Sequence, residues 1–336
     1  MKRYNLCLLG FGNVGRALAA LLVEKRDAMR ERYGIEWRIT GVATRRMNWL
    51  ASAEGFDIAE LLSGEVASAI LPPPSNVSEW LAAARADVLF ETTSLQPETG
   101  EPAVSHVRAA LEMGAHAITA NKGTIVHAYR ELTELARAHR RRFMFEATVA
   151  DCLPVFSLFR ENLPAAELRS FSGLLNSTTN VILEEIERGG TFDDGVRRAR
   201  SLGVTETDPG YDVDGWDSAV KVCAIANVLM NTPLKLDEVR REGIRHLDAR
   251  AVCEARAEGR PYRLIARAER TTDGRLAAFV RPEQLAPTDS FAKLEGTSLA
   301  IQFELDVLPG LTLIARGPDL RSTAYGLLSD FINAVR

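Results

Sequence analysis

The sequence predicts an α/β protein in which a doubly wound parallel sheet is joined to a second, α+β unit. In the first half, short apolar runs of strand length alternate with stretches that carry apolar residues at helical spacing. This alternation is typical of parallel strands joined by right-handed crossovers. After about residue 150 one expected strand is followed by helices, and strand patterns dominate from residue 261 onward, which favours an antiparallel sheet.

The elements of the first half follow from the apolar pattern. We expect strands at residues 4–9, 36–44, 87–93, 116–120 and 142–149. We expect helices at residues 13–32, 101–113 and 124–139. The strands 87–93 and 116–120 are expected to be buried, as strands of a parallel sheet covered on both faces are.

The second half is predicted to contain a strand at 165–176, helices within 177–201 and 214–230, and a hairpin at 262–282 that turns at Asp273 and Gly274. Two further strands, 298–305 and 311–317, precede a last helix at 318–336. We therefore expect two domains, one at 1–147 that is completed by residues 310–336 and a second at 148–309.

Composition excludes several classes of protein. The formal net charge is −4, so there is no general basic field to attract nucleic acid or an anionic membrane. None of the four cysteines forms a CxxC pair, so neither a zinc site nor a disulfide framework is indicated. Asn5, Asn13 and Arg16 interrupt the first apolar stretch, which argues against a signal peptide. No window of 18 apolar residues is present, and we expect a cytoplasmic protein.

The first expected strand ends in a glycine-rich loop, "GFGNVG" at residues 10–15. Gly10 would allow a tight turn, Gly12 a close approach of the backbone to a pyrophosphate, and Gly15 close packing of the helix. The following helix would direct N–H groups of its first turn, including those of Asn13 and Val14, toward the phosphates. The sequence therefore predicts a Rossmann-like dinucleotide site; a glycine turn with only a structural role is the alternative.

The end of the second expected strand bears on the choice of cofactor. A carboxylate there would bind the ribose 2′-hydroxyl of NAD, but the sequence has Arg45 and Arg46. Guanidinium groups suit a 2′-phosphate, which favours NADP, with NAD also possible. The alternative is that both arginines are solvated loop residues.

An acidic stretch in the second half is the strongest candidate for catalysis. It contains five carboxylates, those of Glu206, Asp208, Asp212, Asp214 and Asp217. Their spacing does not match a calcium-binding loop. Lys221 follows Asp217 by one helical turn, just before the apolar run 222–230. A lysine paired with an acid at the start of a buried helix is a candidate proton donor, whereas an exposed pair would be only weakly stabilising.

A second lysine, Lys122, follows an expected strand at its carboxyl end, where open α/β sheets place their ligands. At this point the sequence resembles the homoserine dehydrogenases, in the short form without a C-terminal ACT regulatory domain. The matching segments occur in the same order along nearly the full length: "GFGNVG", "ETTSLQPETGEPA", "ITANKG", "FEATVADCLPVFSL", "GLLNSTTNVIL", "ETDPGYDVDGWDSAVK" and "TAYGLLSD".

The resemblance implies roles for residues of these segments. Lys221 would be the proton donor, and Lys122 would contact cofactor and substrate. Glu206 would bind the substrate amino group, supported by Asp212 and Asp217. Cofactor contacts would come from Thr92, Thr93, Ser94 and Gly317. Many family members bind a sodium ion, for which the candidate ligands here are Glu146, Val149, Asp151 and Leu153. From the residues alone, Glu146 could equally be a structural acid.

The implied activity is the interconversion of L-aspartate 4-semialdehyde and L-homoserine with NAD(P)(H), in threonine, methionine and isoleucine biosynthesis. The implied partner, besides a small-molecule substrate, is a second copy in a homodimer. Two alternatives remain: another NAD(P)-dependent amino-acid dehydrogenase of the same fold, and a regulator that senses NAD(P)H without turnover. A regulator has no use for Glu206, Asp217, Lys122 and Lys221 together, and the sequence shows no basic DNA-binding module.

Overall fold

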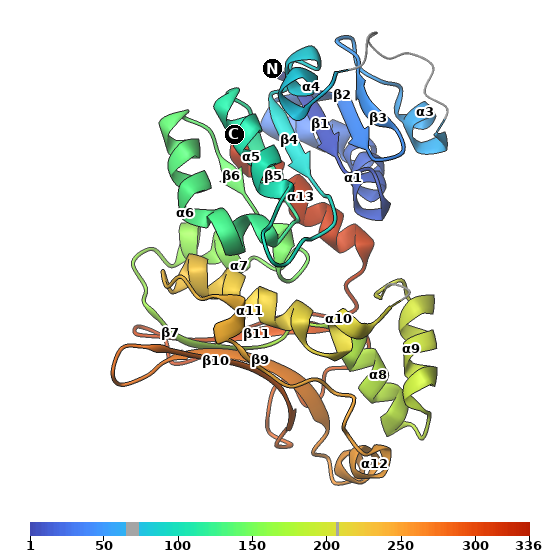
Figure 1. Cartoon of the computed structure of the whole chain (residues 1–336), viewed down its shortest axis with the longest axis vertical. Helices are drawn as coiled ribbons and strands as arrows, with labels where there is room; N and C mark the ends of the chain where they lie inside the picture. The colour runs from blue at the N-terminus through green and yellow to red at the C-terminus, as the bar shows by residue number, and fades with distance from the viewer. Residues whose placement is uncertain (65–73, 206–207) are drawn as a thin grey trace. The chain divides into compact units, whose positions relative to one another are not determined.

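The computed structural model describes residues 1–64, 74–205 and 208–336, which form two compact units (Figure 1). The first unit combines Met1–Pro154 with Leu320–Arg336, and the second is the continuous segment Val155–Asp319. The chain therefore leaves the first unit and returns to it with its last helix. Among the described helices, none is long and apolar enough to span a membrane.

The first unit contains a six-stranded sheet with the strand order β3-β2-β1-β4-β5-β6. Its strands are β1 (Lys2–Leu9), β2 (Ile35–Thr44), β3 (Asn48–Ala51), β4 (Val88–Glu91), β5 (His116–Thr119) and β6 (Phe143–Met144). All neighbouring strands are parallel except β2 and β3. The order reverses direction between β1 and β4, which creates the crevice where such sheets bind ligands. The doubly wound fold predicted from the sequence is confirmed.

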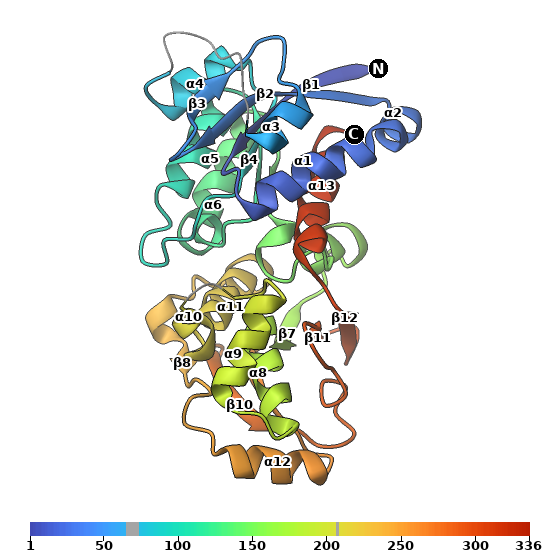
Figure 2. The ribbon, with the colours of Figure 1, turned by 90° about the vertical axis from the view of Figure 1, so that its right-hand side faces the viewer.

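Helices cover both faces of this sheet. They are α1 (Asn13–Glu24), α2 (Arg26–Tyr33), α3 (Ile58–Ser63), α4 (Val77–Ala83), α5 (Ala103–Glu112), α6 (Gly123–Ala138) and α13 (Leu320–Val335). Figure 2 shows α1 and α13, which contact each other, on one face, and α4, α5 and α6 on the other. The expected helix 13–32 is thus two helices, since Lys25 has non-helical backbone angles.

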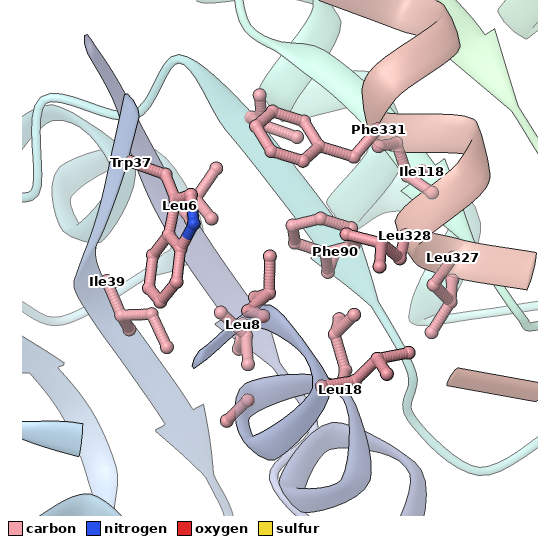
Figure 3. Packing of buried hydrophobic residues seen from close by; sticks show 14 of the residues in the cluster. Leu6, Leu8, Leu18, Trp37, Ile39, Phe90, Ile118, Leu327, Leu328 and Phe331 are labelled. Carbon is pink, nitrogen blue, oxygen red and sulfur yellow. The ribbon is translucent and has the colours of Figure 1, made fainter. Parts of the chain in front are cut away.

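The core of the first unit includes the last helix of the chain. Phe331 of α13 packs edge-on against Phe90 of β4 and Tyr4 of β1, with ring centroids 5.9 Å apart in both pairs. Leu327 and Leu328 face the same core (Figure 3). These α13 side chains are almost completely buried, so the part of the sheet that lies under α13 is not covered until the chain returns to it.

One predicted strand is largely wrong. The expected strand 142–149 is reduced to Phe143–Met144 and is followed by a 3-10 helix at Glu146–Thr148. The reason is a competing acceptor: the N–H of Glu146 donates to the carboxylate of Asp330 on α13, at 2.7 Å, rather than to a neighbouring strand. The apolar pattern of the segment reflects burial against α13 and β5.

The second unit contains another six-stranded sheet, with the order β12-β11-β7-β9-β10-β8. Its strands are β7 (Leu168–Leu174), β8 (Arg240–Arg241), β9 (Tyr262–Arg270), β10 (Leu276–Gln284), β11 (Leu299–Leu305) and β12 (Leu311–Ala315). All pairs are antiparallel except β8 and β10. The predicted hairpin is β9–β10, and Gly274 in its turn has a φ of +81°. The α+β prediction for this half is confirmed.

The helices of the second unit are α8 (Ser177–Glu187), α9 (Phe192–Ser201), α10 (Gly210–Val213), α11 (Trp216–Leu229) and α12 (Ala249–Ala257). Short helical segments lie at α7 (Val155–Ser157), η2 (Leu158–Asn162) and η3 (Leu236–Glu238). Helices α8 and α11 both pack against β9. Because α11 is buried on nearly every face from Asp217 to Asn227, the apolar run in the sequence reflects a central helix of this unit.

The packing of Phe331 generates a test of the first unit. We expect Phe331→Ala to lower the free energy of unfolding of this unit by about 3–5 kcal/mol, because a buried aromatic side chain would be replaced by a cavity. Tyr325→Ala is the matched control, since Tyr325 lies on the same helix and is 49% exposed. Urea unfolding followed by tryptophan fluorescence measures both. Equal free energies of unfolding for the two variants would show that Phe331 of α13 does not stabilise this core.

Candidate active site

The glycine-rich loop connects β1 to α1 at the point where the strand order reverses. Gly10 has a φ of +97°, and a Cβ there would lie 2.6 Å from the main-chain carbon of Thr92. The hydroxyl of Thr92 donates to the carbonyl of Gly10 at 2.7 Å. A Cβ on Gly15 would lie 2.4 Å from the Gly10 carbonyl oxygen. Gly10 therefore forms a tight turn, and Gly15 packs closely against the main chain of that turn.

Gly12 differs from the other two glycines because a Cβ there would meet no described atom within 4 Å. Gly12 is the N-cap of α1, which begins at Asn13, and no side chain caps that helix end. The first turn of α1 also contains no acidic residue. Open space beside the backbone and N–H groups at a helix N-terminus suit a phosphate group. These residues fit a dinucleotide.

The two arginines of the candidate cofactor site lie in the turn between β2 and β3. β2 ends at Thr44, whose hydroxyl accepts the N–H groups of Arg46 at 3.3 Å and of Met47 at 2.9 Å. Arg45 and Arg46 are both exposed, and within the described residues neither guanidinium has an ion-pair partner. Both guanidinium groups are therefore accessible at the carboxyl end of β2, as a contact with the 2′-phosphate of NADP requires.

Lys122 begins the helix that follows β5, and the preceding Asn121 connects its loop to the loop after β4. The amide nitrogen of Asn121 donates to the carbonyls of Thr93 and Ser94 at 3.1 and 3.3 Å. Its amide oxygen accepts the N–H of Gly123 at 2.9 Å. The buried side chain of Asn121 thus connects the two loops that contain the predicted residues Thr93, Ser94 and Lys122. The sequence analysis missed Asn121, although it lies in the "ITANKG" segment.

The candidate cation ligands lie in a turn held by α13. Glu146 is 5% exposed, and Val149 and Leu153 are also buried. Asp151 has a φ of +55°, a backbone conformation that aspartate tolerates better than most residues, and the hydroxyl of Thr323 donates to its carboxylate at 2.6 Å. Within the described residues, no group of three His, Cys, Asp or Glu side chains could hold a metal ion. A cation here would need main-chain oxygens as well.

In the second unit, Lys221 and Asp217 form the expected ion pair on α11. The Lys221 Nζ lies 2.8 Å from the Asp217 carboxylate, and each side chain is 13% exposed. Lys221 also donates to the carbonyl of Leu175 at 2.5 Å. A pair this well buried is held more firmly than a surface pair, and it fixes the ammonium group near the end of β7.

Asp212 joins this pair through Asn176, which the sequence analysis also missed. The amide nitrogen of Asn176 donates to Asp212 at 2.7 Å and to Asp217 at 3.1 Å. Its amide oxygen caps α8 by accepting the N–H of Thr179 at 2.9 Å. An asparagine before a helical segment signals an N-cap, but nothing in the sequence shows that the same side chain bridges two carboxylates.

The environment of Asp212 alters its protonation. Burial raises the pKa of the Asp212 carboxyl above its ordinary value, and the charge of Asp217 raises it further. The hydroxyls of Thr178 and Thr205 each lie 3.1 Å from the second oxygen of Asp212. Asp212 therefore holds a proton to higher pH than an exposed aspartate does, which relieves repulsion between the two carboxyl groups.

Two predicted site residues add little to this geometry. Glu206 lies outside the described residues. Gly317 belongs to the second unit, two residues after the end of β12, and has a φ of +60°. A Cβ at Gly317 would meet no described atom within 4 Å. The residue forms a left-handed turn, for which glycine is suited.

Comparisons with known proteins identify the family. Residues 10–146 match the family model for the homoserine dehydrogenase NAD-binding domain, and residues 154–332 match that for homoserine dehydrogenase. The second match alone covers more than half of the chain. This chain belongs to the homoserine dehydrogenase family.

The homoserine dehydrogenase relatives match over almost the full chain. An NAD(+)-dependent homoserine dehydrogenase of Pseudomonas canavaninivorans is 34% identical, covering 99% of this chain and 96% of that protein. The homoserine dehydrogenase of Methanocaldococcus jannaschii is 32% identical, covering 98% of each. A hyperthermophilic archaeal homoserine dehydrogenase solved in complex with NADPH has a TM-score of 0.82 at 28% identity, covering 99% of this chain and 98% of that one.

Membership of this family makes the protein an oxidoreductase that uses a nicotinamide cofactor. The glycine loop of the first unit fits that cofactor on geometric grounds alone. The prediction of the family from the order of the sequence segments is confirmed.

The contrast between Gly12 and Gly15 provides a test of the cofactor loop. We expect Gly15→Ala to destabilise the first unit by about 1–3 kcal/mol, because its Cβ would collide with the backbone of Gly10. We expect Gly12→Ala to change stability by less than about 0.5 kcal/mol and yet to weaken NADPH binding, because the methyl group would occupy the space beside the phosphates. Urea unfolding and cofactor fluorescence titration measure the two effects. Wild-type affinity in a folded Gly12→Ala variant would show that the dinucleotide does not approach Gly12.

Proposed function

We propose that this chain interconverts L-aspartate 4-semialdehyde and L-homoserine with NAD(P)(H), as a step in the biosynthesis of threonine, methionine and isoleucine. The observation that carries the proposal is the buried ammonium group of Lys221, held between Asp217 and the carbonyl of Leu175 in a chain of the homoserine dehydrogenase family. A bound nicotinamide supplies or accepts the hydride at the carbon that changes oxidation state.

Lys221 is the proposed proton donor. Reduction of an aldehyde leaves an alkoxide oxygen, which needs a proton to become the hydroxyl of homoserine. Lysine has three N–H groups, and the described contacts to Asp217 and Leu175 account for two of them. The third can donate to the substrate oxygen. The ammonium form of Lys221 gives the proton, and in the reverse direction the neutral amine accepts it.

The remaining roles rest on the family resemblance. Glu206 is proposed to bind the substrate ammonium group as a carboxylate, with Asp212 supporting that part of the site through Asn176. Lys122 is proposed to stabilise the negative charge that develops on the substrate oxygen. Thr92, Thr93, Ser94 and Gly317 are proposed to contact the cofactor.

We also propose a sodium site at the turn 146–153. Carboxylates of Glu146 and Asp151 and main-chain carbonyls of Val149 and Leu153 are oxygen donors, which hard cations prefer. The left-handed backbone of Asp151 supports this proposal, because it gives the turn a conformation that glycine would otherwise supply.

The proposed assembly is a cytoplasmic homodimer formed through the sheet of the second unit. The resemblance to the family is its main support. Large apolar side chains are exposed on and near the edge strand β12: Val307 is 69% exposed and Ile314 is 39% exposed. Exposed apolar groups at a sheet edge favour contact with another chain.

The proton-transfer role of Lys221 can be tested directly. We expect Lys221→Ala to lower kcat for reduction of the semialdehyde by roughly 10²- to 10⁴-fold, the usual contribution of a positioned acid. Lys221→Arg should also be slow, because a guanidinium group keeps its proton. NADPH binding should survive in both variants, since the glycine loop belongs to the other unit.

Lys293→Ala is the matched control, because Lys293 is an exposed lysine of the same unit and should leave kcat unchanged. Cofactor oxidation at 340 nm measures turnover, and fluorescence titration measures binding. Turnover of folded Lys221→Ala within threefold of the wild type would reduce Lys221 to a structural ion pair and make Lys122 the better candidate. Binding of cofactor without any turnover by the wild type would instead indicate a sensor.

Cofactor preference is the second property to test, because the relatives include an NAD(+)-dependent enzyme and an enzyme bound to NADPH. We propose a preference for NADP(H), carried by the exposed Arg45 and Arg46. Replacing both with alanine should raise KM for NADPH much more than KM for NADH, because only the former has a 2′-phosphate. Arg32→Ala, on the exposed surface of α2, is the control. A wild type that favours NADH by tenfold in kcat/KM would contradict this assignment.

A further inference from the structure

A completely buried carboxylate lies directly before the loop proposed to contact the cofactor. Glu91 is the last residue of β4 and is 0% exposed. One of its oxygens accepts the N–H of Thr93 at 3.1 Å and also the hydroxyl of Thr93. The loop after β4 is therefore folded back on the side chain that precedes it. A buried carboxylate without such donors would be strongly unfavourable.

The other oxygen of Glu91 faces the next strand of the sheet. The hydroxyl of Thr119, the last residue of β5, lies 3.1 Å from it. The same hydroxyl accepts the N–H of Asn121 at 2.9 Å. On the α5 side, Nδ1 of His106 lies 3.8 Å from Glu91, which is too long for a hydrogen bond. Glu91 thus connects the ends of two neighbouring strands.

Glu91 and Asn121 complete a closed set of bonds between the two loops. Glu91 holds the main-chain N–H of Thr93, and Asn121 holds the carbonyl of the same residue at 3.1 Å. Both polar groups of the Thr93 backbone are therefore fixed by buried side chains. The Thr119 hydroxyl, which also lies 3.2 Å from the Glu91 carbonyl, joins the carboxylate to the main chain of Asn121. Loss of the Glu91 carboxylate would therefore remove one of the contacts that hold the two strand ends.

The order of the strands indicates which half of a dinucleotide these loops face. The glycine loop after β1 fits the pyrophosphate, and Arg45 and Arg46 follow β2 on one side of β1. The end of β4 lies on the opposite side of β1. A dinucleotide that crosses the sheet at this reversal would place its nicotinamide half over the end of β4.

We propose that Glu91 is a positioning residue for the nicotinamide half of the cofactor. Its carboxylate fixes the loop 92–94 through Thr93 and so prepares the surface on which the nicotinamide ring binds. This inference rests on the proposed cofactor site. It assigns Glu91 no direct contact with the reacting atoms.

The test uses Glu91→Gln, which keeps the size of the side chain. The amide oxygen of glutamine can still face Thr93, but it is a weaker acceptor because the charge is lost. Isothermal titration would compare NADPH with 2′-phospho-ADP-ribose, which lacks nicotinamide; NADH and ADP-ribose provide a parallel pair. We expect the dinucleotide to bind about tenfold more weakly, the effect of losing one charge-assisted hydrogen bond. The fragment should bind within twofold of the wild type.

A second variant and a control keep the result interpretable. Thr119→Val removes the neighbouring donor while Glu91 remains, and it should weaken the dinucleotide in the same selective way. Glu112→Gln, at an exposed glutamate of the same unit, should change neither affinity.

Three outcomes would overturn the inference. Equal weakening of dinucleotide and fragment by Glu91→Gln would indicate a general loss of folding, and unchanged affinity for both would show that the carboxylate does not prepare the nicotinamide side. If the wild type binds none of the four probes, the proposed cofactor site fails and this inference fails with it. Normal binding by the wild type with no selective loss in the variants rejects the role of Glu91 alone.

Discussion

No side chain fits between Gly10 and Thr92, and the arrangement of the first unit depends on that close approach. The ends of β1 and β4 lie so near each other that a Cβ at Gly10 would collide with the Thr92 backbone. The loop after β1 is consequently directed into α1, with its N–H groups exposed beside Gly12. The loop after β4 is directed toward β5, where Glu91, Thr119 and Asn121 hold it. The close approach of the Gly10 and Thr92 backbones thus lies between two different loops. The loop after β1 is suited to phosphate, and the loop after β4 is held by buried side chains.

The candidate site of the second unit is built from charged side chains rather than from backbone N–H groups. Two carboxyl groups and one ammonium group lie close together with little access to water. Asn176 separates the carboxyl groups by donating to both, and burial together with the charge of Asp217 raises the pKa of Asp212 above its ordinary value. The amide is neutral, so it can organise the charged groups without adding another charge to a buried site.

The sequence predicts the fold and the charged residues because their signals are local. A glycine spacing, an i, i+4 pair such as Asp217 and Lys221, and an alternation of apolar runs can be read within one segment. Asn121, Asn176 and Glu91 are different, because their partners come from other segments and only the folded chain shows that they meet. The strand expected at 142–149 fails for the same reason: the acceptor that replaces the neighbouring strand, Asp330, is supplied by a helix far along the chain.

The return of α13 to the first unit affects the order in which the protein can be built on the ribosome. Synthesis proceeds from the N-terminus at about 5–20 residues per second, and Phe331 completes a core that begins at Tyr4. The continuous segment Val155–Asp319 emerges in full before that helix does. The unit encoded second can therefore finish folding first, while part of one apolar face of the N-terminal sheet stays uncovered. In a nascent chain, that face is the surface most in need of protection from aggregation.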